Sequence, residues 1–175
     1  MAFADPAVIV NYFGLKPDMV VADFGAGSGA YALAMAEQTR PNGKVYAVDV
    51  QKDLLTTLKN QARERHLTNL EVLWGDVETL GGSKIGDQKM DFILLSNVLF
   101  QTEAGYQAAL EAKRILRPGG QAAVIDWQES FGGLGPPPEK IIPADAAKKL
   151  FAQAGFAYNK SFPAGDHHYG LIFRE

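Results

Sequence analysis

Cysteine is absent from the 175-residue sequence, which excludes disulfide bonds, thiolate metal ligands and a cysteine nucleophile. Long hydrophobic runs are absent too, because no apolar stretch approaches the ~20 residues that a membrane-spanning helix requires. The first cationic side chain is that of Lys16, so the amino terminus lacks the basic start of a signal peptide. We therefore expect a cytoplasmic protein without a membrane span.

An excess of positive charge is also missing. The chain has 17 Lys and Arg against 20 Asp and Glu, which gives a formal net charge of −3. This balance provides no global attraction to nucleic acid or to an anionic membrane, so no nucleic-acid partner is expected. The length is typical of one domain, and we expect residues 1–175 to fold as a single unit.

Apolar runs and helix-forming segments alternate through the first 127 residues, which predicts a parallel sheet with helices on both faces. The expected strands cover residues 19–24, 44–50, 69–75, 90–96 and 121–127. The expected helices cover residues 28–38, 52–66, 103–116 and, near the end of the chain, 144–154. Two final strand-like runs flank a Pro-Ala-Gly turn at 163–165, which predicts an antiparallel hairpin.

The first strand leads directly into a glycine-rich turn. The segment MVVADFGAGSGAYALAMA, residues 19–36, places Gly25, Gly27 and Gly29 between an apolar run and a run of helix formers. In α/β sheets this order forms a cradle for a phosphate or nucleotide, because glycines let the backbone approach the ligand and the helix start offers free N–H groups. A generic tight turn is the alternative interpretation.

Three further polar residues follow predicted strands. Asp49 ends the second strand, roughly 20 residues after the turn, where a carboxylate can accept hydrogen bonds from both ribose hydroxyls. Asp76 follows the third strand and could accept from an adenine amino group, with the Val77 N–H facing a ring nitrogen, and Asn97 follows the fourth. As alternatives, Asp49 is a helix N-cap and Asp76 a turn residue.

Five stretches resemble, in order and spacing, the motifs of the class I S-adenosylmethionine-dependent methyltransferases. They are VVADFGAGSG, VYAVDV, LEVLWGDVE, MDFILLSNVL and ILRPGGQAAVIDW. The resemblance implies a Rossmann-like, seven-stranded, mostly parallel sheet whose last strand is antiparallel, with helices on both faces. It also implies S-adenosylmethionine as the cofactor.

The resemblance carries the cofactor-binding role to nine positions of this sequence, with Asp23 helping to position the methionine portion. These positions are Asp23, Gly25, Ala26, Gly27, Asp49, Val50, Asp76, Val77 and Asn97. The ending AGDHHYGLIF is similar to that of the quinone-biosynthesis branch, which implies a small-molecule methyl acceptor. No residue is assigned to a metal, and the oligomeric state is left open.

An antiparallel last strand begins at the sheet edge where the parallel strands end. This topology brings residues 166–169 close to Asn97 and Trp127, and makes His167 or His168 a candidate general base or substrate contact. Because adjacent strand residues face opposite sides, at least one of the two histidines can be structural. The Gly- and Pro-rich segment 128–142 is either a lid over the acceptor or a mobile connector.

Three other functions fit parts of the pattern. Gly25, Gly27 and Ala30 match the looser spacing of nicotinamide-dependent oxidoreductases, but the second mononucleotide-binding half is missing. The chain could instead be a non-catalytic S-adenosylmethionine-binding partner or regulatory domain. A methyltransferase of macromolecules is disfavoured for nucleic acid, because residues 97–100 read Asn-Val-Leu-Phe rather than Asn-Pro-Pro-Tyr, but a protein acceptor remains open.

Overall fold

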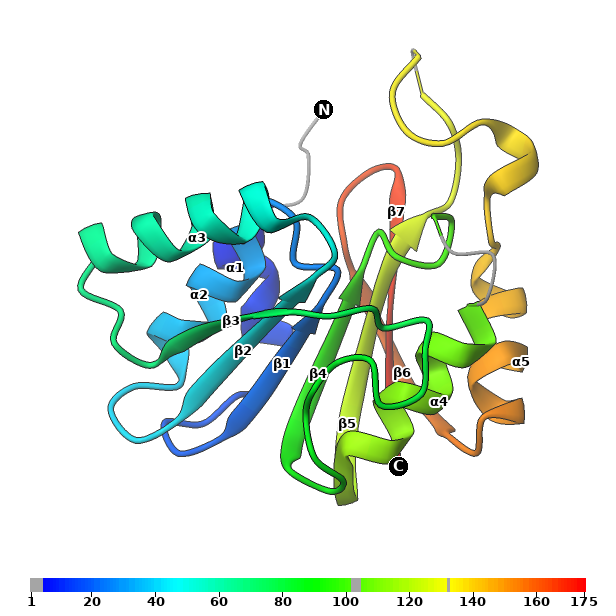
Figure 1. Ribbon diagram of the computed structural model, residues 1–175. Helices are drawn as coiled ribbons and strands as arrows, with labels where there is room; N and C mark the ends of the chain where they lie inside the picture. The colour runs from blue at the N-terminus through cyan, green and yellow to red at the C-terminus, as the bar shows by residue number, and fades with distance from the viewer. Residues whose placement is uncertain (1–4, 102–104, 132) are drawn as a thin grey trace.

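A seven-stranded β-sheet runs through the computed structural model, which describes residues 5–101, 105–131 and 133–175 (Figure 1). The strands are β1 (Val20–Phe24), β2 (Lys44–Asp49), β3 (Leu70–Trp74), β4 (Met90–Ser96), β5 (Leu116–Trp127), β6 (Ala157–Pro163) and β7 (His168–Arg174). Their order in the sheet is β3-β2-β1-β4-β5-β7-β6. The first five strands are parallel, and β7 lies antiparallel between β5 and β6. The predicted fold is confirmed.

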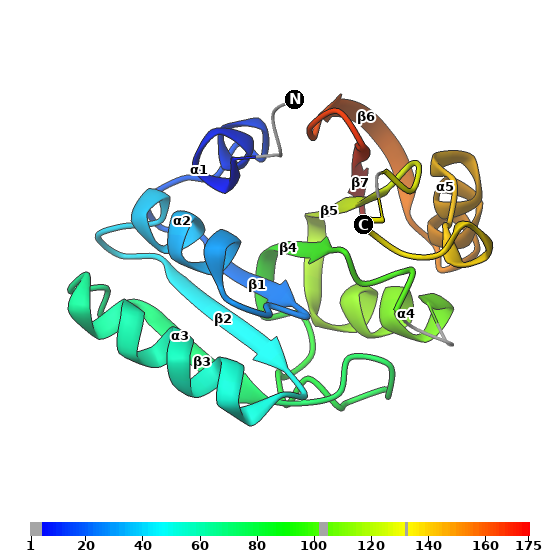
Figure 2. The ribbon, with the colours of Figure 1, turned by 90° about the horizontal axis from the view of Figure 1, so that it is seen from above.

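Helices cover both faces of this sheet. They are α1 (Pro6–Ile9), α2 (Ala30–Gln38), α3 (Lys52–Glu64), α4 (Gly105–Ile115) and α5 (Ala144–Gln153), with short 3-10 turns η1 (Val10–Tyr12) and η2 (Pro138–Lys140). Seen from above, α1 and α2 lie on one side of the sheet and α4 and α5 on the other (Figure 2). Leu58 of α3 packs in the same core as α1 and α2.

Alternate residues of β1 face the two cores. Val21 packs against α1 and α2, whereas Ala22 and Phe24 pack in the core that includes α4 and α5, and all three are fully buried. A strand that is covered on both faces needs apolar side chains on both, which explains why β1 reads as a continuous apolar run.

Several predicted boundaries differ from the structure, and two of the differences have clear local reasons. The helix expected from residue 28 begins at Ala30, because Gly29 is left-handed, with a φ of 82°. The strand expected from residue 121 already begins at Leu116, which pairs with Met90 before a register shift in β5. The helix expected over 103–116 ends at Ile115, and its expected start lies outside the described residues.

The direction of the strand connections reverses at β1, which pairs with β2 on one side and with β4 on the other. Open α/β sheets bind ligands at such a switch point, outside the carboxyl ends of the strands. This topology therefore places the expected site between the ends of β1 and β4.

Candidate active site

A cavity opens at the carboxyl ends of β1, β2, β3 and β4. Seven of the predicted cofactor residues line it, namely Gly25, Gly27, Asp49, Val50, Asp76, Val77 and Asn97. Asp23 and Ala26, also predicted, do not line this cavity. The segments that follow four different strands thus converge on one site, as the sequence predicted.

The glycine turn holds its shape through backbone hydrogen bonds to β2. The N–H groups of Gly25 and Ala26 both donate to the Val48 carbonyl, at 2.9 and 3.0 Å. Gly27 has a φ of 53°, and a Cβ there would have only the Gly25 carbonyl oxygen near it, at 3.9 Å. The backbone at Gly27 is therefore bare toward the cavity, so a ligand can approach it closely.

Asp49 is fixed between the turn and α3. Its Oδ2 accepts from the Gly27 N–H and its Oδ1 from the Gln51 N–H, each at 2.8 Å. The side chain is nearly buried, with 7% exposed. Since an ionised carboxylate has about four acceptor positions, two remain for hydroxyl groups in the cavity. The N-cap of α3 is Gln51, so the alternative of Asp49 as that helix's N-cap is wrong.

Asp76 begins a turn at the opposite wall. Its Oδ1 accepts from the Glu78 N–H at 2.9 Å and its Oδ2 from the Thr79 hydroxyl at 3.1 Å. The alternative prediction that Asp76 is a turn residue is thus confirmed. The same exposed residue also lines the cavity. Val77 is buried beside it.

Asp23, the last residue but one of β1, is a buried carboxyl group with an incomplete set of partners. Its Oδ2 has no hydrogen-bond partner among the described residues. Burial, followed by the charge of Asp49, raises the pKa of Asp23 to about 8, while a hydrogen bond from the Ala32 backbone opposes the shift. Burial and the Asp23 charge likewise raise the pKa of Tyr31 to about 12. A cationic group placed near this carboxyl would favour its ionisation.

The start of β7 meets the end of β4, as the topology predicted. His168 Nε2 lies 3.1 Å from Asn97 Oδ1, and the His168 ring lies 4.2 Å from that of Trp127. Burial, and secondarily the neighbouring His167, lower the pKa of His168 below its ordinary value. His168 is therefore neutral near pH 7 and joins the cavity through Asn97.

His167 has a different environment. Its Nδ1 lies 2.9 Å from Glu129 Oε1, and its ring stacks on Phe131 with centroids 4.2 Å apart. Its Nε2 is buried without a hydrogen-bond partner in the described part of the chain. Glu129 was not predicted as a site residue, because only the fold brings the segment after β5 against the start of β7.

The segment 128–142 rises beyond the carboxyl end of β5 (Figure 1). Phe131 and Leu134 form an isolated bridge, and an added Cβ at Gly135 would come within 2.8 Å of the Trp127 ring. The segment is thus folded against the wall formed by Trp127 and His167. Gly132 of this segment lies outside the described residues.

Several lining residues were missed by the sequence-based assignment. They are Val48, Gln51, Gly75, Glu78, Val98 and Gln101. Most are immediate neighbours of predicted residues, so their position after a predicted strand end could have identified them. Gln101 is different, since its Nε2 donates to the Asn97 carbonyl at 2.6 Å from a segment without a sequence motif.

Among residues 5–101, 105–131 and 133–175, no three His, Asp or Glu side chains are grouped as a metal site requires. Within the same ranges, no helix combines the length and apolar character needed to span a bilayer.

Residues 15–167 match a family described as a methyltransferase domain. The chain belongs to the class I S-adenosylmethionine-dependent methyltransferases. Its fold is that of a solved S-adenosylmethionine-dependent methyltransferase from Aquifex aeolicus, with a TM-score of 0.88 and 27% identity over 98% of this chain and 90% of that one. S-adenosylmethionine is accordingly the cofactor of this methyltransferase.

Curated relatives are longer and match a smaller share of this chain. A demethylmenaquinone methyltransferase from Listeria welshimeri is 29% identical over 62% of this chain and 45% of its own length. A 2-phytyl-1,4-naphtoquinone methyltransferase from Trichormus variabilis is 27% identical over 67% of this chain and 51% of its own. The methyltransferase chain described here spans about half the length of these relatives.

Proposed function

We propose that this methyltransferase transfers the methyl group of S-adenosylmethionine to a planar small molecule. The observation that carries the proposal is the hydrogen bond between His168 and Asn97, which joins an aromatic wall to the cavity at the strand ends. The proposal treats residues 1–175 as one catalytic domain and the cytoplasm as its location.

The cofactor is proposed to lie across the glycine turn. Asp49 accepts from the ribose hydroxyls, Asp76 from the adenine 6-amino group, and the Val77 N–H faces a ring nitrogen. Two features support this placement: the bare backbone at Gly27 and the unpartnered Oδ2 of Asp23, which suits the ammonium group of the methionine portion. Of the remaining predicted residues, Gly25, Val50 and Asn97 would shape the walls, and Ala26 would support the turn through its hydrogen bond to the Val48 carbonyl.

When bound, the cofactor would supply a methyl group on positively charged sulfur, which would pass to the acceptor and leave S-adenosylhomocysteine. The protein's main task is to hold the acceptor in line with the carbon–sulfur bond at near-attack distance. Trp127 and His168 form an aromatic wall, with ring planes tilted by 40° to each other, and a planar acceptor can lie against the face of one of these rings. We propose that the segment 128–142 closes over it.

His168 is the proposed proton acceptor. With the Asn97 amide oriented as it stands, its oxygen only accepts, so His168 Nε2 carries the proton and Nδ1 is free to receive another. The lowered pKa keeps the ring neutral near pH 7. His167, bonded to Glu129, would support the same wall or contact the acceptor.

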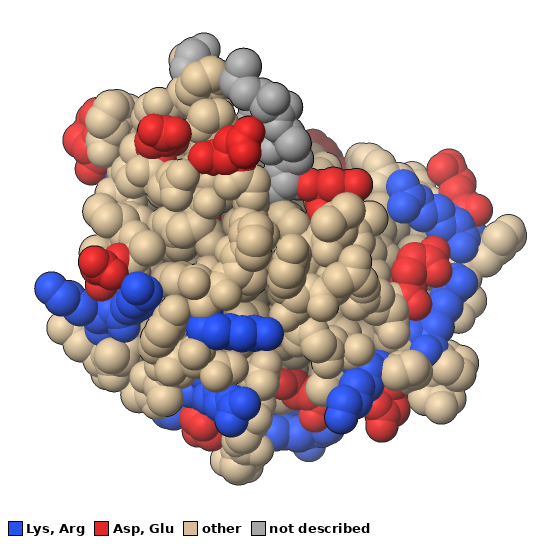
Figure 3. Space-filling view, turned by 180° about the vertical axis from the view of Figure 1, so that it is seen from behind, with Lys and Arg blue, Asp and Glu red and all other residues tan. Residues whose placement is uncertain are grey.

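Charge supports a small acceptor rather than a polyanion. The face in Figure 3 shows Lys and Arg side chains interspersed with Asp and Glu, with large uncharged areas between them. The net charge of −3 points the same way. The relatives named for quinone methylation support a planar ring as the acceptor class.

The test is methyl transfer from isotopically labelled S-adenosylmethionine to a panel of hydroxylated aromatic and quinol compounds and to a cell extract. We expect label in a low-molecular-mass product, and a fall of ~10²–10⁴-fold in turnover for His168→Ala if it acts as general base. A protein that binds the cofactor but labels nothing would instead be the non-catalytic binding domain. Label confined to protein would contradict the small-molecule acceptor.

A further inference from the structure

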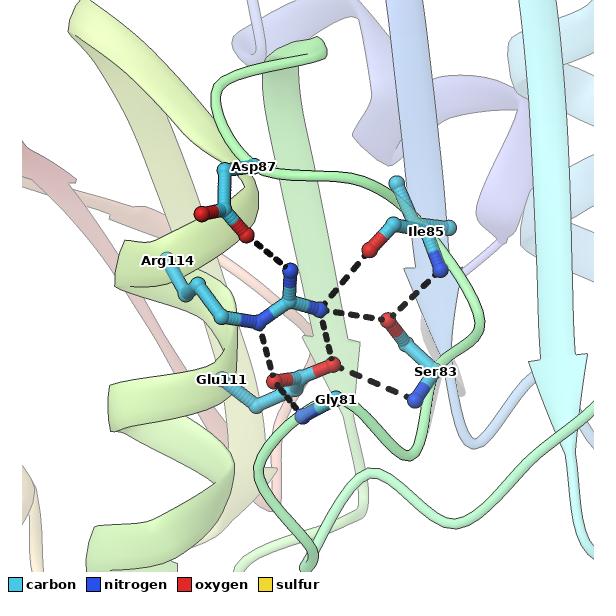
Figure 4. Close-up of polar contacts among 6 residues, drawn as sticks. All are labelled: Gly81, Ser83, Ile85, Asp87, Glu111 and Arg114. Atoms are coloured by element: carbon cyan, nitrogen blue, oxygen red, sulfur yellow. Dashed lines mark hydrogen bonds and ion pairs between the residues drawn. The ribbon is translucent and has the colours of Figure 1, made fainter.

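A cluster of ion pairs around the buried Glu111 joins α4 to the segment between β3 and β4 (Figure 4). Glu111 of α4 has no exposed surface, and Arg114 donates to both of its carboxylate oxygens, at 2.7 and 2.8 Å. Arg114 also donates to Asp87 and, at 2.8 Å, to the Ile85 carbonyl. The guanidinium therefore ties the later part of this segment to the helix.

Glu111 forms hydrogen bonds with the earlier part of the same segment. Its Oε2 accepts from the Gly81 N–H at 2.7 Å, and its Oε1 accepts from the Ser83 N–H at 3.1 Å. Burial disfavours its charge, but hydrogen bonds from Arg114, Ser83 and Gly81 outweigh that cost and lower the pKa of Glu111. The carboxylate is thus ionised and fixed on both sides of residue 82.

Gly82, the residue between these two contacts, is pressed against Asp76. The Gly82 carbonyl accepts from the Asp76 N–H at 3.1 Å. A Cβ at Gly82 would stand 2.0 Å from the Asp76 carbonyl oxygen, so the two backbones touch. The Gly82 N–H donates to the Thr79 carbonyl, which closes the turn onto itself.

We infer that Glu111 is a positioning residue for the adenine end of the cofactor site. Its carboxylate fixes the positions of Gly81 and Ser83 by hydrogen bonds, and these two residues fix Gly82 between them. The Gly82 carbonyl in turn accepts from the Asp76 N–H and so positions the Asp76 backbone at the cavity wall. This inference rests on the proposed role of Asp76 toward the adenine 6-amino group. A purely structural role would stabilise the fold without affecting which base the site prefers.

The variant that tests this is Glu111→Asp, which keeps the charge facing Arg114 but withdraws the carboxylate by one methylene from Gly81 and Ser83. We expect its Kd for S-adenosylhomocysteine to rise about tenfold, the equivalent of one hydrogen bond. The matched control is Lys113→Gln, which breaks an ion pair of the same helix with Glu175, away from the segment. Its Kd should stay within twofold of the wild-type value.

Base discrimination separates positioning from stability. S-inosylhomocysteine carries a carbonyl oxygen in place of the 6-amino group, so the wild-type protein should bind it more weakly than S-adenosylhomocysteine. Glu111→Asp should reduce this preference, and the effects of Glu111→Asp and Asp76→Ala should combine to less than their product. An unchanged preference, or fully multiplicative effects, would overturn the inference.

A measurement on the wild-type protein covers the case of a variant that does not fold. Coupling between two sites is reciprocal, so S-adenosylhomocysteine should slow hydrogen exchange at the Gly81 and Ser83 amides. Unaltered exchange there would overturn the inference too. If the wild-type protein binds no S-adenosylhomocysteine, the cofactor site itself fails; if it binds but Asp76→Ala has no effect, only the adenine assignment and this inference fail.

Discussion

At the scale of single residues, the Asp49 carboxylate fixes the geometry of the proposed cofactor site. Asp49 receives the N–H groups of Gly27 and Gln51, so it ties the glycine turn to the start of α3. Its remaining acceptor positions are the ones proposed for the ribose hydroxyls. The same side chain therefore shapes the site and would contact the ligand.

Replacing this carboxylate should be costly for binding. We expect Asp49→Ala to weaken S-adenosylhomocysteine binding by ~1.5–3 kcal/mol, the scale for hydrogen bonds to a charged group. Isothermal titration calorimetry measures the change directly. Asp53→Ala, which alters an exposed residue in the first turn of α3, is the control and should bind as the wild type does. Equal affinities for both variants would remove Asp49 from the ribose site.

Asp23 makes the binding reaction sensitive to pH. With a pKa of about 8 the carboxyl is mostly protonated at pH 7 in the free protein. An ammonium group nearby would favour the ionised form, so cofactor binding should release a proton and affinity should increase as the pH rises from 6 to 8. Calorimetry at pH 7 in buffers of different ionisation enthalpy counts the protons. Asp23→Asn should abolish the release; its persistence would assign the proton to another group.

The same raised pKa affects the stability of the free protein. The unfolded carboxyl titrates near 3.8, below the folded value of about 8, so the folded state holds an extra proton between these values. The contribution of Asp23 is therefore fully present below pH 3.8 and is lost as the pH rises toward 8. Urea titrations across this range should show a shallower loss of stability for Asp23→Asn.

At the scale of elements, the junction of β1 and α2 depends on a left-handed glycine. Gly29 has a φ of 82°, and a Cβ there would stand 2.2 Å from Leu58 Cδ1. Gly29→Ala should therefore cost more than the ~1–2 kcal/mol expected for the backbone conformation alone. Gly119, with a φ of 79° and nothing within 4 Å of its added Cβ, isolates that backbone cost. Similar urea midpoints for Gly29→Ala and Gly119→Ala would mean that Leu58 simply moves aside.

The elements that could be predicted are those whose pattern is local. The apolar strands and the polar residues at their ends follow from chain order and the parallel topology, which brought Asp49, Asp76 and Asn97 to one edge. The cluster of Glu111 and Arg114 could not be predicted, because an i, i+3 charge pair on an amphipathic helix is typical of a solvated surface. Only packing against the segment before β4 shows that Glu111 is buried.

At the scale of the whole molecule, ligand binding and folding are linked. A ligand that binds only the folded state stabilises it by about 2.7 kcal/mol at 100 times its Kd. S-adenosylmethionine and S-adenosylhomocysteine should therefore raise the unfolding temperature in a concentration-dependent way, by several degrees for a chain of this size, whereas NAD(H) and NADP(H) should not. Differential scanning fluorimetry compares the four ligands under one condition. Stabilisation by the nicotinamide dinucleotides alone would contradict the assignment of S-adenosylmethionine to this site, because Gly27 and Asp49 would then bind a dinucleotide.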